Sequence, residues 1–129
     1  MDKNLMNISQ IESYIYSILK DKVSKQVFAS TPPDTISGKW EDMCIIDCGT
    51  INDYNALGRG SILIWLYVKP KSNGTKNVLK MSQMEEALNE VLKNSNNNIY
   101  RINKLNTFCD YDAERKWHCN IVELNIKIV

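Results

Sequence analysis

The sequence predicts a single α+β domain over residues 1–129, with a four-stranded, mostly antiparallel sheet and two helices packed on one face. Three observations lead to this fold class. Apolar residues recur at helical spacing in two segments, apolar runs typical of strands occupy four others, and their order along the chain is α-β-β-α-β-β. A chain of 129 residues with 43% hydrophobic residues is also suited to one hydrophobic core.

The first helix is predicted from Gln10 to Lys25, because its apolar residues fall at three- and four-residue steps and form one stripe. Ser9 and Glu12 have the spacing of a capping box at its start. Pro32 and Pro33 cannot continue a helix, since proline lacks the amide donor and restricts the residue before it. The chain is therefore expected to turn there.

The first strand is predicted from Lys39 to Cys48, and the polar stretch from Thr50 to Gly60 is predicted to be a loop. The segment from Ser61 to Lys69 is apolar on both alternating faces, which indicates a central strand covered on both sides. A second amphipathic helix is predicted over Met81–Leu92.

The last part of the chain predicts a long β-hairpin, with strands Ile99–Tyr111 and Trp117–Val129 joined around Glu114. A turn centred on Glu114 fixes which residues face each other. The pairs expected on the core face are Tyr100 with Ile128, Ile102 with Ile126, Lys104 with Leu124, and Asn106 with Val122. This face should pack on the helices.

The opposite face of the hairpin is predicted to be polar at its base and apolar near its tip. The base pairs are Arg101 with Lys127, Asn103 with Asn125, and Leu105 with Glu123. The tip pairs are Thr107 with Ile121, Cys109 with Cys119, and Tyr111 with Trp117. An aromatic and apolar patch that faces away from the core requires a partner. Candidate interface residues are therefore Cys109, Tyr111, Trp117, Cys119 and Ile121.

Composition argues against several classes of protein. Sixteen Lys and Arg against fifteen Asp and Glu give a formal net charge of +1, which is no basis for holding nucleic acid. Neither a membrane span nor an export signal is recognisable in the sequence, so the expected location is the cytoplasm. The four cysteines are then expected to be reduced thiols, with Cys44 and Cys48 serving as packing residues.

One cluster in the hairpin offers an alternative reading as a small metal- or ligand-binding enzyme. In the expected register His118 faces Asp110, and Asp112 and Glu114 follow nearby, so an imidazole and several carboxylates come close together. A surface pair near a turn explains the same pattern, and the sequence holds no familiar catalytic motif. The prediction is that the chain is not an enzyme and carries no metal or cofactor.

The pattern as a whole resembles the small tail-terminator or tail-completion proteins of tailed bacteriophages and prophages. The resemblance rests on the helix Ile8–Val23, the Pro32-Pro33 turn before the strand Trp40–Cys48, and the entry Gly58-Arg59-Gly60-Ser61-Ile62 to a hydrophobic strand. It continues through the helix Met81–Leu92 and the closing hairpin.

This resemblance implies a ring-type homo-oligomer that closes a tail tube and contacts other tail or head-tail proteins, first in the cytoplasm and then in the virion. By position, the hairpin patch would lie between subunits and the loop Thr50–Gly60 would contact the tube. The loop residues that become candidate contacts are Asn52, Asp53, Tyr54, Leu57 and Arg59. An adaptor module that binds other proteins remains a further alternative.

Overall fold

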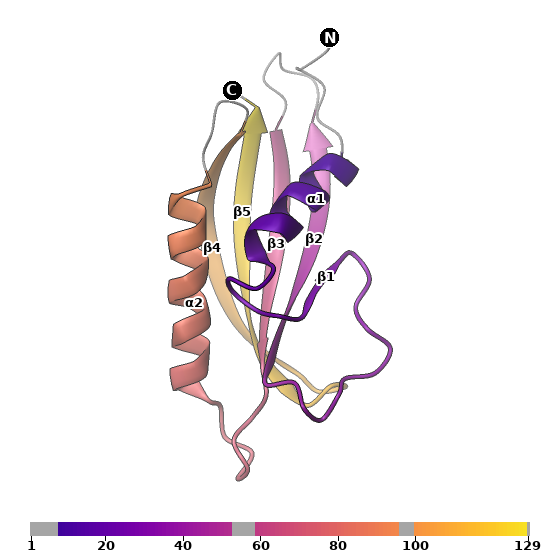
Figure 1. Cartoon of the computed structure of the whole chain (residues 1–129), viewed down its shortest axis with the longest axis vertical. Helices are drawn as coiled ribbons and strands as arrows, with labels where there is room; N and C mark the ends of the chain where they lie inside the picture. The colour runs from indigo at the N-terminus through magenta and orange to yellow at the C-terminus, as the bar shows by residue number, and fades with distance from the viewer. Residues whose placement is uncertain (1–7, 53–58, 96–99, 129) are drawn as a thin grey trace.

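The computed structural model describes residues 8–52, 59–95 and 100–128 and has an α+β fold, as predicted. Both helices lie on the same face of one sheet, α1 toward the β2 side and α2 toward the β4 side (Figure 1). The elements are α1 Ile8–Leu19, β1 Val27–Ala29, β2 Asp42–Asn52, β3 Arg59–Val68, α2 Val78–Lys93, β4 Tyr100–Asp112 and β5 Trp117–Ile128.

The sheet has five strands in the order β1-β2-β3-β5-β4, so the prediction of four strands is wrong by one. The additional strand is β1, whose three residues pair in parallel with β2, while the other three pairings are antiparallel. Three residues are too few to show an alternating pattern, which is why the sequence did not reveal this strand. The segment predicted to be central, now β3, does lie in the middle of the sheet.

The helix boundaries also differ from the prediction. α1 ends at Leu19 instead of continuing to Lys25, because Asp21 adopts a left-handed backbone conformation with φ of 64°. α2 begins at Val78, earlier than predicted, because the side chain of Asn77 caps it by accepting a hydrogen bond from the backbone N–H of Lys80 at 3.1 Å.

The main core lies between the helices and the sheet. The stripe of α1 contributes Ile11, Ile15 and Leu19, and that of α2 contributes Met81, Met84, Leu88 and Leu92. The strand residues opposite them include Cys44, Ile46, Ile62, Ile64, Leu66, Ile102, Val122, Leu124 and Ile126. Amphipathic helices on an alternating strand pattern therefore account for the larger part of the buried surface.

A second, smaller core lies on the face of the sheet opposite the helices. Its buried members are Met43, Ile45, Tyr67, Trp117 and Cys119, and partly buried Phe28, Ile36, Trp40, Trp65 and Ile121 pack against them. Ile36 and Trp40 belong to the segment between β1 and β2, which thus covers this end of the sheet. The prediction of an outward patch at Trp117 and Cys119 is wrong, because the structure buries both.

The hairpin register follows the prediction from Tyr100 with Ile128 as far as Lys104 with Leu124, and then shifts by one residue. The shift is a bulge at Leu105, after which Asn106 faces Glu123 and Phe108 faces Ile121. The predicted pairs of Cys109 with Cys119, Tyr111 with Trp117, Thr107 with Ile121, Asn106 with Val122, Leu105 with Glu123 and Asp110 with His118 are therefore wrong. Because side chains alternate along a strand, every residue of β4 beyond the bulge changes face.

Candidate protein-interaction surface

The candidate loop residues lie only partly within the described structure. Asn52 and Arg59 form the last pair of residues between β2 and β3, so these two strands extend into the stretch predicted as a loop. Asp53, Tyr54 and Leu57 lie outside the described residues. The proposed contact of this loop with another protein remains a prediction.

The candidate hairpin residues do not form one patch. Trp117 and Cys119 are 7% and 1% exposed in the second core, and Ile121 is partly buried beside them. Cys109 and Tyr111 are exposed, and the bulge turns them to the face that carries the helices. The predicted cluster is thus divided between the two sides of the sheet.

The exposed surface of this region is strand β4 itself. It lies at the edge of the sheet, and all its residues from Asn103 to Tyr111 are exposed. Leu105, Phe108 and Tyr111 are large apolar or aromatic side chains that are 55%, 51% and 47% exposed. A long edge strand with exposed apolar side chains and unpaired backbone groups is a site at which a further chain can add.

Sequence reasoning missed Leu105 and Phe108 as surface residues. It paired Leu105 with a glutamate on the polar face and left Phe108 on the core face, because an uninterrupted register was assumed. The one feature of the sequence that could have indicated the bulge is Leu105, an apolar residue that interrupts a polar stretch between Lys104 and Asn106.

The tip of the hairpin is fixed by Asp112. Its carboxylate accepts hydrogen bonds from the Tyr67 hydroxyl at 2.9 Å, from the Arg115 guanidinium at 2.7 Å, and from the backbone N–H groups of Glu114 and Arg115 at 3.1 and 3.0 Å. The Arg115 guanidinium also lies 5.8 Å from the centre of the Tyr67 ring. These contacts tie the turn to β3 and thus to the second core.

This arrangement shifts two pKa values in opposite directions. Burial raises the pKa of the Asp112 carboxyl, but the hydrogen bonds from Arg115 and Tyr67 outweigh it and leave the pKa below its usual value. Burial, followed by the hydrogen bond to Asp112, raises the pKa of the Tyr67 hydroxyl. Tyr67 is therefore held as a neutral donor and Asp112 as a charged acceptor.

We expect Asp112→Asn to destabilise the protein by about 1–3 kcal/mol at neutral pH, since a charged acceptor of several hydrogen bonds is lost. Folding lowers the pKa of the Asp112 carboxyl. The charged carboxylate therefore stabilises the folded protein fully above the usual aspartate pKa of about 4, and this stabilisation is lost as the pH falls through the lower pKa of the folded state. Urea unfolding at pH 7 and pH 3 should therefore show the difference from wild type shrinking in acid. Asp110→Asn, on an exposed residue of the same strand, is the control and should change little at either pH. A pH-independent difference for Asp112→Asn would contradict the assignment.

The alternative catalytic cluster is separated by the structure. His118 faces Tyr111, with ring centres 4.9 Å apart, and is on the opposite side of the sheet from Asp110 and Asp112. Its Nδ1 is enclosed and has no hydrogen-bond partner among the described residues. Within those same residues, no group of three or more His, Cys, Asp or Glu side chains is placed to hold a metal ion.

All four cysteines are free thiols. Burial raises the pKa of Cys44, and it raises the pKa of Cys48 to about 12 and that of Cys119 to about 11, with nearby carboxylates adding to each effect. Cys44 lies in the main core and Cys48 packs against it, as the sequence predicted. Cys109 is exposed and faces Asn120, so it is not the neighbour of Cys119.

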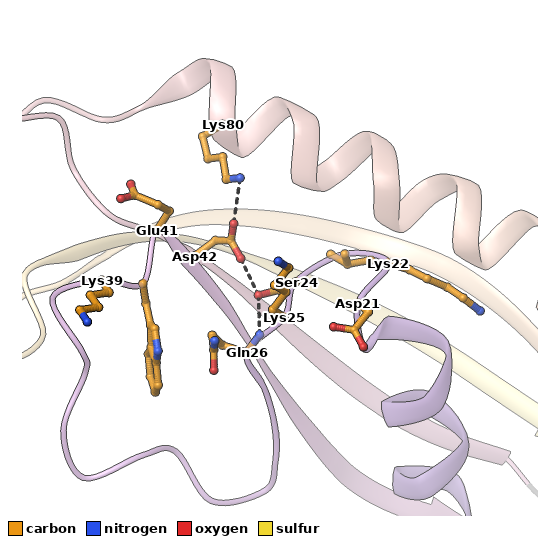
Figure 2. A pocket seen from close by; sticks show the side chains of 11 residues that line it. Asp21, Lys22, Ser24, Lys25, Gln26, Lys39, Glu41, Asp42 and Lys80 are labelled. Carbon is orange, nitrogen blue, oxygen red and sulfur yellow. Dashed lines mark hydrogen bonds and ion pairs between the residues drawn. The ribbon is translucent and has the colours of Figure 1, made fainter.

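A polar pocket of about 340 Å³ lies where the turn after α1 meets β2 and the start of α2. Figure 2 shows the carboxylate of Asp42 at its centre, held by the Ser24 hydroxyl and by the Lys80 ammonium, whose Nζ lies 2.9 Å from Oδ2. Lys22 and Lys39 point away from this carboxylate (Figure 2). The lysines of the pocket thus do not converge as they would on a bound anion.

A second hollow, of about 530 Å³, separates α1 from α2 and is more apolar. Tyr14, Ile18, Ala87 and Val91 line it, and the Tyr14 hydroxyl donates a hydrogen bond to the backbone carbonyl of Ser95 at its end. This hydrogen bond joins α1 to the residues that follow α2, at the rim of the hollow. Lys22, Glu90, Asn94 and Ser95 complete the lining, so the hollow has an apolar wall and several polar groups.

Comparison of the sequence with models of known protein families gives no match, and comparison with curated proteins gives none either. Among the residues that the structure describes, neither helix has the length and apolar character needed to cross a membrane.

Proposed function

We propose that this chain is a structural assembly protein that forms a ring-type homo-oligomer, and that its ring is the terminator or completion ring of a phage or prophage tail. The observation that carries the proposal is the edge strand β4, exposed along most of its length and bearing three large apolar side chains. Such an edge is an assembly surface because a neighbouring chain can satisfy its backbone groups and cover its side chains together.

The other edge of the sheet supports the same proposal. Ile8 and Tyr16, on the solvent side of α1, are also large exposed hydrophobic residues, and α1 packs beside β1 and β2. Apolar surface at both ends of one sheet is suited to a repeating contact between identical subunits. Other tail or head-tail proteins would then contact the rim of the ring, for which the stretch Thr50–Gly60 remains the candidate.

The primary test is the native mass at several concentrations, followed by electron microscopy of the particles. We expect a concentration-dependent oligomer that becomes ring-shaped and that binds the open end of isolated tail tubes. A strict monomer at high concentration that also fails to bind tail tubes would count decisively against the proposal. A monomer that captures a different protein through β4 would favour the adaptor alternative.

Phe108→Asp should weaken self-association by about tenfold or more, because a charge replaces an apolar side chain at the centre of the surface. Sedimentation equilibrium measures the dissociation constant of the oligomer directly. Leu79→Asp is the matched control, since Leu79 is 70% exposed but lies on helix α2 and not on an edge strand. Equal loss of association in the two variants would show that β4 has no special part in assembly.

A further inference from the structure

We infer that β4 of one copy adds to the β1 edge of the next copy, so that the sheet continues from subunit to subunit. This inference rests on the proposed self-assembly and names the two surfaces that meet. β4 and β1 form opposite edges of the sheet (Figure 1). β1, β2 and β5 run in one direction, and β3 and β4 run in the other. A second copy placed beside the first in the same plane therefore brings β4 of one copy antiparallel to β1 of the other.

The rows of paired residues show which positions would meet. One row across the sheet contains Thr107, Val122, Ile64, Ile46 and Ala29. The next contains Phe108, Ile121, Trp65, Ile45 and Phe28. A lateral copy with no stagger therefore places Thr107 opposite Ala29 on the helix face. It places Phe108 opposite Phe28 on the other face, where the two rings form an aromatic cross-strand pair.

The exposed apolar residues agree with this contact. Ala29 and Tyr16 line a hollow of about 300 Å³ beside α1, at the same level of the sheet as Thr107. Leu105 and Phe108 stand on either side of Thr107 in β4. Thr107 therefore faces this hollow of the next copy, while Phe108, on the opposite face of the sheet, meets Phe28.

One pair of opposite charges supports this contact. Arg101 and Lys104 give the upper part of β4 positive charge, and the Lys104 row ends at Cys48, beside which Glu12 lies close enough to affect its pKa. Asp47 ends the row of Asn106. Lys104 therefore lies at the level of the acidic Glu12 of the next copy, and this pair of opposite charges favours the docking without stagger.

The lower end of β4 has a matching feature. The row of Tyr111 ends at Asp42, and Asp42 lies in the polar pocket of Figure 2, which opens on Lys25 and Gln26 just before β1. The half-exposed ring of Tyr111 is thereby placed at this 340 Å³ pocket of the next copy. A phenol, with an apolar ring and a polar tip, fits a pocket lined by alkyl stems and charged ends.

A contact between two different edges is heterologous, so it propagates and then closes into a ring if each step rotates the next subunit suitably. An isologous contact of β4 with β4 would stop at a dimer. The two arrangements differ in which residues come within disulfide distance, and this difference provides the experiment.

The test is disulfide trapping with Thr107→Cys and Ala29→Cys, both small changes at partly or fully exposed positions, in a Cys109→Ser background. Facing residues of an antiparallel pair have Cα atoms about 4.5–5.5 Å apart, within the range of a disulfide. We expect the double variant to give a covalent ladder up to the native oligomer after mild oxidation. A mixture of the two single variants should give covalent dimers only, and neither single variant alone should cross-link.

Two results overturn the inference alone, and a third overturns the proposed function together with it. Cross-linking of Thr107→Cys alone would show a β4-to-β4 contact. An oligomer of unchanged native mass without any cross-link would show that assembly uses other surfaces. A monomeric double variant would be checked against the Cys109→Ser parent, and a monomeric parent with native circular dichroism would overturn both the inference and the proposed function.

Discussion

Trp117→Ala is expected to destabilise the protein by about 3–5 kcal/mol, the usual cost of removing a large aromatic residue from a core. The indole is 7% exposed and belongs to the second core, together with Met43, Tyr67 and Cys119. The cavity left behind would also loosen the segment that carries Trp40, which packs on the same cluster. Urea unfolding followed by circular dichroism measures the change in the free energy of unfolding.

Tyr111→Ala is the control for this prediction, because it removes an aromatic residue from the same hairpin at a site that is 47% exposed. In a monomeric sample, Tyr111→Ala should change the free energy of unfolding by no more than about 1 kcal/mol. Equal effects of the two substitutions would mean that Trp117 lies on an open surface, without the cover that Ile36 and Trp40 provide.

Leu88→Ala is expected to cost about 2–5 kcal/mol, since it removes a buried side chain where α2 packs on the sheet. Leu88 is 1% exposed, and its neighbours in the main core come from both helices and from the strands. Leu79→Ala makes the same chemical change on the same helix at a 70% exposed site, and should cost about 0.5 kcal/mol or less. Thermal or urea unfolding of the pair compares them directly, and similar losses would contradict the described packing of α2.

Much of the fold could be predicted from periodicity, because the spacing of apolar residues in a long amphipathic segment indicates which of its side chains are buried. The two helices, the central position of β3 and the ends of the hairpin follow from such segments. β1 could not be predicted, since three residues carry no period and its pairing with β2 depends on how the chain leaves α1. Helix ends were missed where one residue decided them, as with Asp21 and Asn77.

The candidate surface was predicted less well than the fold, for two reasons. The hairpin pairs are correct up to Lys104, and the bulge at Leu105 then changes the face of every following side chain in β4. Trp117 and Cys119 were placed on the correct face, but nothing in the strand pattern indicated that the segment with Ile36 and Trp40 would cover them. A connecting segment folds over a sheet through tertiary packing, which local sequence does not encode.

The open edge at β4 also has a consequence for the newly made chain. An edge strand can pair with an extended polypeptide, including another unfolded copy of the chain. The bulge at Leu105 and the charges of Arg101 and Lys104 limit this by twisting the strand and repelling a parallel copy of itself. An uncovered edge of this kind favours aggregation of the chain at high concentration.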